Sequence, residues 1–149
     1  MWILVCLECV LLAVVMADIS PQYNGKKAQC PVLLVDLSIT NTTTHLAFDG
    51  GQKLFFGSED AKSAYMANPR AYWMSPYDMP KMDQMNGFPD VTGSTFLCPF
   101  SKESMNIGMQ TPRVFHRSGQ AIYFCCFGCV QKFWYEPESI FSEQIGRST

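Results

Sequence analysis

The sequence predicts a small α+β fold in which two units, each a β-hairpin followed by a short helix, stand in tandem. Three observations predict this class. The chain of 149 residues repeats a set of Cys, Pro and Gly positions at one fixed offset. Each copy contains a short β-rich run after a Gly-Gln pair. Apolar residues at the spacing of one helical face follow each run.

The repeat needs no gap, and its offset is 68 residues, the difference between Cys30 and Cys98. We take residues 28–73 and 96–141 as the two copies. The aligned residues are Cys30-Pro31 with Cys98-Pro99, Gly51-Gln52 with Gly119-Gln120, Leu54-Phe55-Phe56 with Ile122-Tyr123-Phe124, Tyr65 with Phe133, Pro69 with Pro137, and Tyr72-Trp73 with Ile140-Phe141.

Each copy is expected to begin with its Cys-Pro pair and a β-prone segment, Val32 to Ile39 in the first copy and Phe100 onward in the second. The Gly-Gln turn then leads into the β-rich run, Lys53 to Phe56 or Ala121 to Phe124.

A short helix is expected to follow each β-rich run. Its apolar positions are Ala61, Ala64 and Tyr65 in copy one, and Val130, Phe133 and Trp134 in copy two. Asn68-Pro69 and Glu136-Pro137 should end these helices, because proline cannot continue the hydrogen-bond ladder. Units of this size rarely fold on hydrophobic burial alone, so a metal, a disulfide or a partner unit is expected.

Residues 1–17 are predicted to be a secretory signal peptide. The stretch from Trp2 to Ala17 is apolar except for Glu8, and it is shorter than the roughly 20 residues that span a bilayer. Val15 and Ala17 place small residues before a cleavage point. The alternatives are an uncleaved anchor or a buried element. We therefore expect a secreted, lumenal or periplasmic protein with no membrane contact beyond the signal peptide.

The charge balance and the motifs that the sequence lacks argue against some classes of function. The 11 basic and 13 acidic residues nearly balance, and no basic run indicates nucleic-acid binding. No Ser/His/Asp set, carboxylate pair or phosphate loop indicates an enzyme. Asn41-Thr42-Thr43 is a glycosylation sequon that is usable in a eukaryotic secretory pathway.

The second copy carries the residues with metal chemistry. Cys126 and Cys129 form a C-x-x-C pair where the β-rich run meets the helix, and Cys98 comes from the distant Cys-Pro turn. Three such sulfurs can hold one soft ion, Zn²⁺ or Cu(I), with Cys125 as a fourth ligand or a nearby spare. We expect a metal sensor, buffer or delivery module, with the metal ion and possible transfer proteins as its partners.

This part of the chain resembles a YHS domain, a relative of TRASH-type heavy-metal-binding modules. The residues that carry the resemblance are Cys98-Pro99, the string from Gly119 to Cys129, Lys132-Phe133 and Glu136-Pro137-Glu138. Phe115-His116-Arg117-Ser118 is a loosened form of the motif that names the family. The resemblance implies treble-clef-like units, heavy-metal handling (most often copper) and no catalysis in the module itself.

The first copy keeps Cys30-Pro31 but lacks the other cysteines. Gly57, Ser58 and Ala61 occupy the positions of Cys125, Cys126 and Cys129. One thiolate cannot make a structural metal site, so we interpret copy one as a degenerate unit that contributes core. A site shared between Cys30 and the second unit is the alternative.

Two further groups are candidate ligands. His116 is either an additional ligand or a hydrogen-bonded histidine of a hairpin, whereas His45 has no cysteines in its own copy and is expected to be structural. The segment 74–95 is expected to be an irregular linker, and it carries Met79, Met82 and Met85 at a regular spacing. Their thioethers suit Cu(I), but flexible apolar contact is the favoured interpretation.

Two other functions compete with metal binding. Residues 18–149 contain five cysteines, an odd number that rules out complete pairing within the chain. Two disulfides would nevertheless make a stapled secreted interaction protein, which suits an oxidising compartment. Thiol–disulfide catalysis by Cys126 and Cys129 ranks lowest, because a thioredoxin-like C-x-x-C needs a larger βαβ context.

Overall fold

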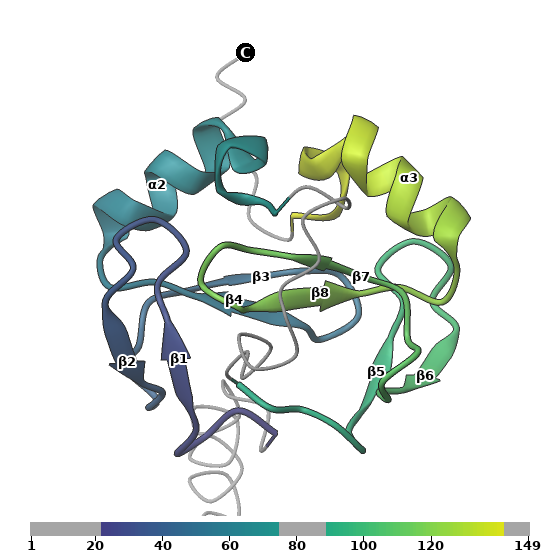
Figure 1. Ribbon diagram of the computed structural model, residues 1–149, viewed down its shortest axis with the longest axis horizontal. Helices are drawn as coiled ribbons and strands as arrows, with labels where there is room; N and C mark the ends of the chain where they lie inside the picture. Colours follow the sequence, from purple (N-terminus) through teal and green to yellow (C-terminus); the bar gives the residue numbers. More distant parts are fainter. Residues whose placement is uncertain (1–21, 75–88, 142–149) are drawn as a thin grey trace, which may run out of the picture.

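The computed structural model describes residues 22–74 and 89–141 (Figure 1). The predicted signal peptide, residues 1–17, lies outside the described residues. The first half contains β1 (Lys27–Gln29), β2 (Asp36–Ser38), β3 (His45–Ala47), β4 (Lys53–Phe55), α2 (Glu59–Ala67) and the 3-10 helix η1 (Pro69–Tyr72). The second half contains β5 (Thr95–Leu97), β6 (Ser104–Asn106), β7 (Arg113–Phe115), β8 (Ala121–Tyr123), α3 (Phe127–Tyr135) and the 3-10 helix η2 (Pro137–Ile140).

The two halves have the same order of elements. Each element of the second half begins 68 residues after its counterpart, as Thr95 does after Lys27. Consecutive strands pair in four antiparallel two-stranded sheets: β1 with β2, β3 with β4, β5 with β6, and β7 with β8. The predicted small α+β class is therefore confirmed.

The Cys-Pro segment differs from its prediction. Of the expected strand from Val32 to Ile39, only Asp36–Ser38 is a strand in the structure. The residues before it form a closed turn, in which the N–H of Leu34 donates to the Cys30 carbonyl at 2.9 Å. A strand that the sequence analysis missed, β1, precedes the cysteine, so Cys30 lies where a hairpin turns rather than where a strand begins.

The helices follow their prediction because local signals define their ends. The side chain of Ser58 caps α2 and accepts a hydrogen bond from the Ala61 N–H at 3.1 Å. Both helices end two residues before a proline, α2 at Ala67 before Pro69 and α3 at Tyr135 before Pro137, as expected. Cys126 takes the capping position of α3 but makes no capping hydrogen bond there.

The helices lie on one side of the two central hairpins, β3–β4 and β7–β8, and the outer hairpins flank them (Figure 1). A single hydrophobic cluster combines buried side chains of both halves. The largest fully buried aromatic residues in it are Phe55, Phe56, Tyr65, Phe124 and Phe133. The two halves therefore share one core instead of burying a core each.

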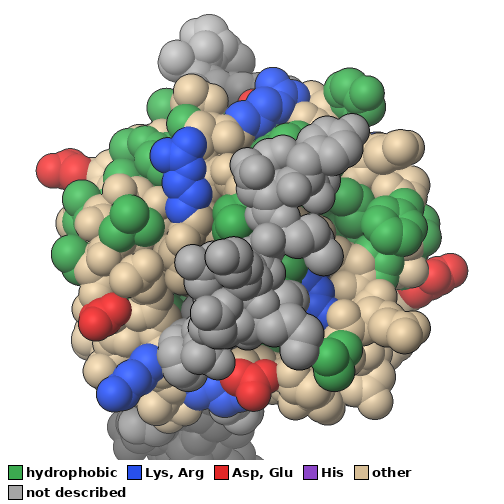
Figure 2. All heavy atoms as spheres, viewed as in Figure 1, with side chains coloured by type: hydrophobic (Ala, Val, Ile, Leu, Met, Phe, Trp, Pro, Cys, Tyr) green, Lys and Arg blue, Asp and Glu red, His purple; other side chains and the backbone are tan. Residues whose placement is uncertain are grey.

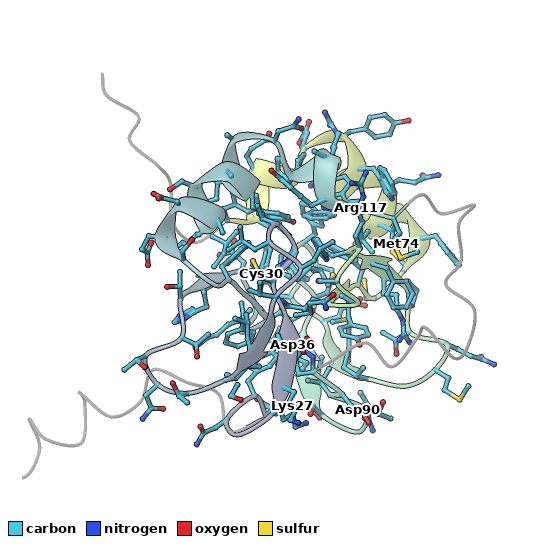
Figure 3. All side chains as sticks on the ribbon, turned by 60° about the vertical axis from the view of Figure 1, so that its left-hand side comes forward. Lys27, Cys30, Asp36, Met74, Asp90 and Arg117 are labelled. Carbon is cyan, nitrogen blue, oxygen red and sulfur yellow. The ribbon has the colours of Figure 1, made fainter. Side chains whose placement is uncertain are left out.

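The segment after each helix packs on the other half. Trp73 forms an antiparallel bridge with His116, and Phe141 forms the equivalent bridge with Phe48. Met74 and Arg117, labelled in Figure 3, flank the first bridge, where the Arg117 N–H donates to the Tyr72 carbonyl at 3.0 Å. The residues after each helix thus pack on the partner half.

Two buried glutamines join the central hairpins in a reciprocal way. Gln52 Nε2 donates to the Tyr123 carbonyl at 2.8 Å, and the Tyr123 N–H donates to Gln52 Oε1 at 2.8 Å. Gln120 makes the same pair of bonds with Phe55, at 2.9 and 3.0 Å. The same contact is used twice, as in a two-fold symmetric dimer whose subunits are the two halves of one chain.

In the view of Figure 2, basic and acidic side chains are scattered over the described residues and form no large patch of one charge. Within residues 22–74 and 89–141, no helix is both long enough and apolar enough to cross a membrane.

Candidate metal centre

The first side of the candidate centre is the turn between β5 and β6. The N–H of Lys102 donates to the Cys98 carbonyl at 3.0 Å, and the Cys98 N–H donates to the Glu103 carbonyl at 2.8 Å. Lys102 adopts a left-handed φ of 62°, which closes the turn tightly. Leu34 has the same conformation in the first half, with φ 56°. This turn holds Cys98 fully buried.

The second side is the junction between β8 and α3. Cys125 follows the strand, and Cys129 lies in the first turn of the helix. The sulfurs of Cys98, Cys125 and Cys129 all lie within 4.8 Å of one another. The Cys125 and Cys129 sulfurs are 3.7 Å apart. Zn–S bonds of about 2.3 Å in a tetrahedron give sulfur separations of about 3.8 Å, so this spacing fits one shared ion.

The converging group contains Cys125 and not Cys126, although the sequence analysis gave Cys126 the primary role and Cys125 the accessory one. The backbone at Cys126 is extended, with φ −157° and ψ 165°. Successive side chains of extended backbone point to opposite sides, so neighbouring cysteines cannot both face Cys98 without rearrangement. Cys126 is instead exposed at the start of α3.

The thiols of the group influence one another electrostatically. Burial alone raises the pKa of Cys98, but hydrogen bonds from the Ser101 hydroxyl and from nearby backbone N–H groups outweigh burial and lower this pKa to about 7. Burial and the neighbouring sulfurs raise the pKa of Cys129. The metal-free group therefore favours one thiolate with protonated neighbours, whereas a cation favours deprotonation of all three.

One hydroxyl group lies directly beside the sulfurs. The hydroxyl of Ser101 lies 3.2 Å from the Cys125 sulfur. The ammonium group of Lys132 lies 4.8 Å from the centre of the Phe100 ring, on the same turn as Ser101. Ser101 was not predicted from the sequence, although its place in the Cys98 turn was the available signal.

The matching place in the first half is filled by hydrocarbon. A side-chain carbon added at Gly57 would lie 3.2 Å from methyl carbons of both Leu33 and Val35. The residues at the equivalent positions of the second half are Ser101 and Glu103, which are polar. The first half therefore has an apolar turn packed against a glycine where the second half has a sulfur group and a polar turn.

Cys30 lies in the interior of the molecule, whereas Asp36 on the following strand is exposed (Figure 3). The N–H of Leu33 points at the Cys30 sulfur from 3.4 Å. Among the described residues, Cys30 is not part of the converging sulfur group.

His116 is completely buried between the two halves, and both of its ring nitrogens have protein partners. Nδ1 lies 2.9 Å from the Gln120 carbonyl, and Nε2 lies 2.9 Å from the Tyr65 hydroxyl. Of the two roles considered for His116, metal ligand and hydrogen-bonded histidine, these contacts match the second. They leave no ring nitrogen free to bind an ion. Burial lowers its pKa to about 4.

The remaining candidates lie apart from the sulfur group. Met79, Met82 and Met85 fall outside the described residues. Asn41 is exposed in the turn between β2 and β3, where a sequon is accessible. His45 is half-buried, and its Nδ1 lies 3.1 Å from the Thr43 carbonyl.

Comparison of the chain with protein-family models, with curated proteins and with solved structures gives no significant match. The class that the fold and the site define is therefore a small α+β protein with a cysteine cluster able to hold a metal.

Proposed function

We propose that this protein binds one soft metal ion, Cu(I) or Zn²⁺, through the thiolates of Cys98, Cys125 and Cys129. The observation that carries the proposal is the convergence of these three sulfurs within 4.8 Å. Two elements far apart in the sequence supply them, the Cys98 turn and the start of α3. A cysteine that is buried only for packing has no reason to lie beside two other cysteines at the spacing of ligands to one ion.

The chemistry of the donors selects the class of ion. Thiolates favour Cu(I) and Zn²⁺ over Mg²⁺ and Ca²⁺, which take oxygen ligands. Three sulfurs complete a trigonal site. A tetrahedral Zn²⁺ site needs a fourth ligand, for which Cys126 and water are the nearest candidates.

We further propose that both halves derive from the YHS or TRASH-like module, with treble-clef-like units and the first unit degenerate. The common order of elements and the constant offset support this proposal. The equivalent turns of Cys30 and Cys98 support it as well. The proposal includes an exported location and a role as a sensor, buffer or delivery module without catalysis.

Anaerobic titration of the full chain with Zn²⁺ or Cu(I) tests the metal site. The matched variants are Cys129→Ala, which copies Ala61 of the first half, and Cys30→Ala, which removes the cysteine outside the sulfur group. We expect one tightly bound ion per chain in the wild type and in Cys30→Ala, and loss of tight binding in Cys129→Ala. Equal metal content in all three proteins would contradict the proposed site.

One observation favours a second function, the disulfide-stapled interaction protein. The Cys125 and Cys129 sulfurs are near enough, at 3.7 Å, to be oxidised to a disulfide after a small rotation of the side chains. A thiol count on protein purified without reductant separates the two functions. Free thiols that bind metal support the metal site, whereas a Cys125–Cys129 disulfide that forms spontaneously supports the staple.

A further inference from the structure

The four cysteines of the second half differ in how much of each residue solvent can reach. Cys98 is completely buried, Cys125 and Cys129 are half-buried, and Cys126 is exposed. An ion that approaches from solvent therefore meets Cys126 before it can reach the converging group.

Cys126 lies beside the outer members of the group but not beside its innermost one. Its sulfur interacts with the thiols of Cys129 and Cys125. It is absent from the group of sulfurs that all lie within 4.8 Å of one another, which includes Cys98. This position links the surface to the group without completing the group.

The surface around Cys126 is open. A side-chain carbon added at Gly128 would meet only the Cys126 sulfur, at 3.7 Å, and no other neighbour within 4 Å. The neighbouring Phe127 is 76% exposed and does not pack into the core, so it does not hold a cover over the Cys126 thiol. A bulky, sulfur-bound carrier can therefore approach this thiol, whereas Cys98 is shielded.

We propose that Cys126 is the exchange ligand through which the site takes Cu(I) from a carrier that holds the ion by thiolates. This inference rests on the proposed metal-binding function. The Cys126 sulfur forms a bond to the ion, and one bond between the ion and a carrier thiolate breaks. The proton of Cys126 passes to the departing thiolate. The ion keeps its oxidation state. Cys125, Cys129 and Cys98 then displace the remaining carrier thiolates and finally Cys126 by the same exchange. The protons that the incoming thiols release pass to the departing thiolates, so Cys126 ends as a thiol again.

The first half shows which substitutions the fold accepts at this place. Ser58 occupies the position of Cys126 and caps its helix with a hydrogen bond of 3.1 Å to the Ala61 N–H. The variant Cys126→Ser should therefore gain a helix cap, and a loss of folding is not expected. Asp60 occupies the position of Gly128, so this position tolerates a side chain. Gly128→Leu also raises helix propensity and places a side chain over the Cys126 sulfur.

The experiment is stopped-flow transfer of Cu(I) to the full chain, with equilibrium affinity measured separately by competition with a chelator. One donor is the glutathione complex of Cu(I), and the other is Cu(I) held by a chelator without sulfur. We expect Cys126→Ser to take Cu(I) from glutathione about tenfold more slowly than the wild type, because thiolate exchange depends on access to the attacking sulfur. Gly128→Leu should also be slower, and Cys30→Ala should match the wild type.

The outcomes separate this inference from the proposed function. Cys126→Ser should change affinity far less than Cys129→Ala, for which a loss of more than about 100-fold is expected because a ligand itself is removed. Wild-type rates in Cys126→Ser, with tight binding retained, would overturn the exchange role alone. An equal loss of affinity in both variants would make Cys126 a structural ligand and would also overturn it. A wild-type protein that binds no Cu(I) would refute the proposed function and this inference together.

Discussion

Lowering the pH should weaken the contact between the two halves through His116. This histidine is completely buried, and burial lowers its pKa from 6.5 to about 4. Its Nδ1 faces the Gln120 carbonyl, which only accepts, so Nδ1 carries the proton and Nε2 accepts from the Tyr65 hydroxyl. Trp73 Nε1–H donates to the oxygen of Tyr65 at 3.2 Å. A proton on Nε2 would leave the Tyr65 hydroxyl hydrogen without an acceptor.

The sign of the effect follows from the depressed pKa. Between about pH 6.5 and pH 4, the unfolded chain binds a proton at His116 that the folded chain excludes. The free energy of unfolding therefore falls as the pH falls, by at most about 1.4 kcal/mol per pH unit. From pH 7 to pH 5 the expected loss is about 2 kcal/mol, and the whole contribution of this group, about 3 kcal/mol, is lost near pH 4.

Urea unfolding at pH 7, 6 and 5 measures this loss, and the protein offers a matched control. Phe133 and Phe48 occupy the positions equivalent to Tyr65 and His116, and their rings lie 6.4 Å apart. The double variant Tyr65→Phe/His116→Phe copies that pair and removes the titrating group. Its unfolding free energy should lose about 2 kcal/mol less than that of the wild type between pH 7 and pH 5. The same dependence in both proteins would refute the assignment to His116.

Three further predictions concern the shared core. Gln120→Ala leaves the buried N–H and carbonyl of Phe55 unpaired, and urea unfolding should show a loss of about 3 kcal/mol; a loss below about 0.5 kcal/mol would show that the glutamine contacts do not join the halves. Gly50→Ala should lower the melting temperature much more than Gly51→Ala, because both have positive φ but only the new carbon at position 50 collides with the Leu97 carbonyl; equal effects would contradict this packing. Removal of metal with a chelator should leave the far-ultraviolet circular dichroism unchanged, because the shared core holds the fold; unfolding on chelation would mean that the ion supplies the stability instead.

The sequence predicted the helices and the class of fold because these depend on local signals. Glycine and proline residues, such as Gly51 with Gly119 and Pro69 with Pro137, occur at the same places in both halves, and they fix turns and helix ends without long-range contacts. The strands were harder to predict. Strands of three residues, such as Lys27–Gln29, are too short to show the alternation of apolar and polar residues.

The contact between the halves could not be predicted from local patterns. Gln52 and Gln120 were recognised only as turn residues, yet each reaches across to the backbone of the other half. Whether a buried polar residue finds its partner within its own unit or in another depends on how the units pack. Likewise, His116 was predicted as either a ligand or a hydrogen-bonded residue, and its contacts with Gln120 and Tyr65 favour the second role.

The candidate site was predicted in its members but not in their roles. Spacing identified Cys98 and the cysteines near α3, because a C-x-x-C pair at a helix start can chelate one ion. The choice between Cys125 and Cys126 depends on the backbone angles at the start of α3, where neighbouring side chains point to opposite sides. Sequence spacing carries no information on that choice.

X-ray absorption at the metal edge, on the full chain loaded anaerobically with one equivalent of Cu(I), tests the central claim most directly. The claim predicts a first shell of three sulfurs in the wild type and in Cys126→Ser, and a shell that loses sulfur in Cys125→Gly, which copies Gly57. A shell that loses sulfur in Cys126→Ser but keeps it in Cys125→Gly, or a shell of nitrogen and oxygen atoms, would contradict the site formed by Cys98, Cys125 and Cys129.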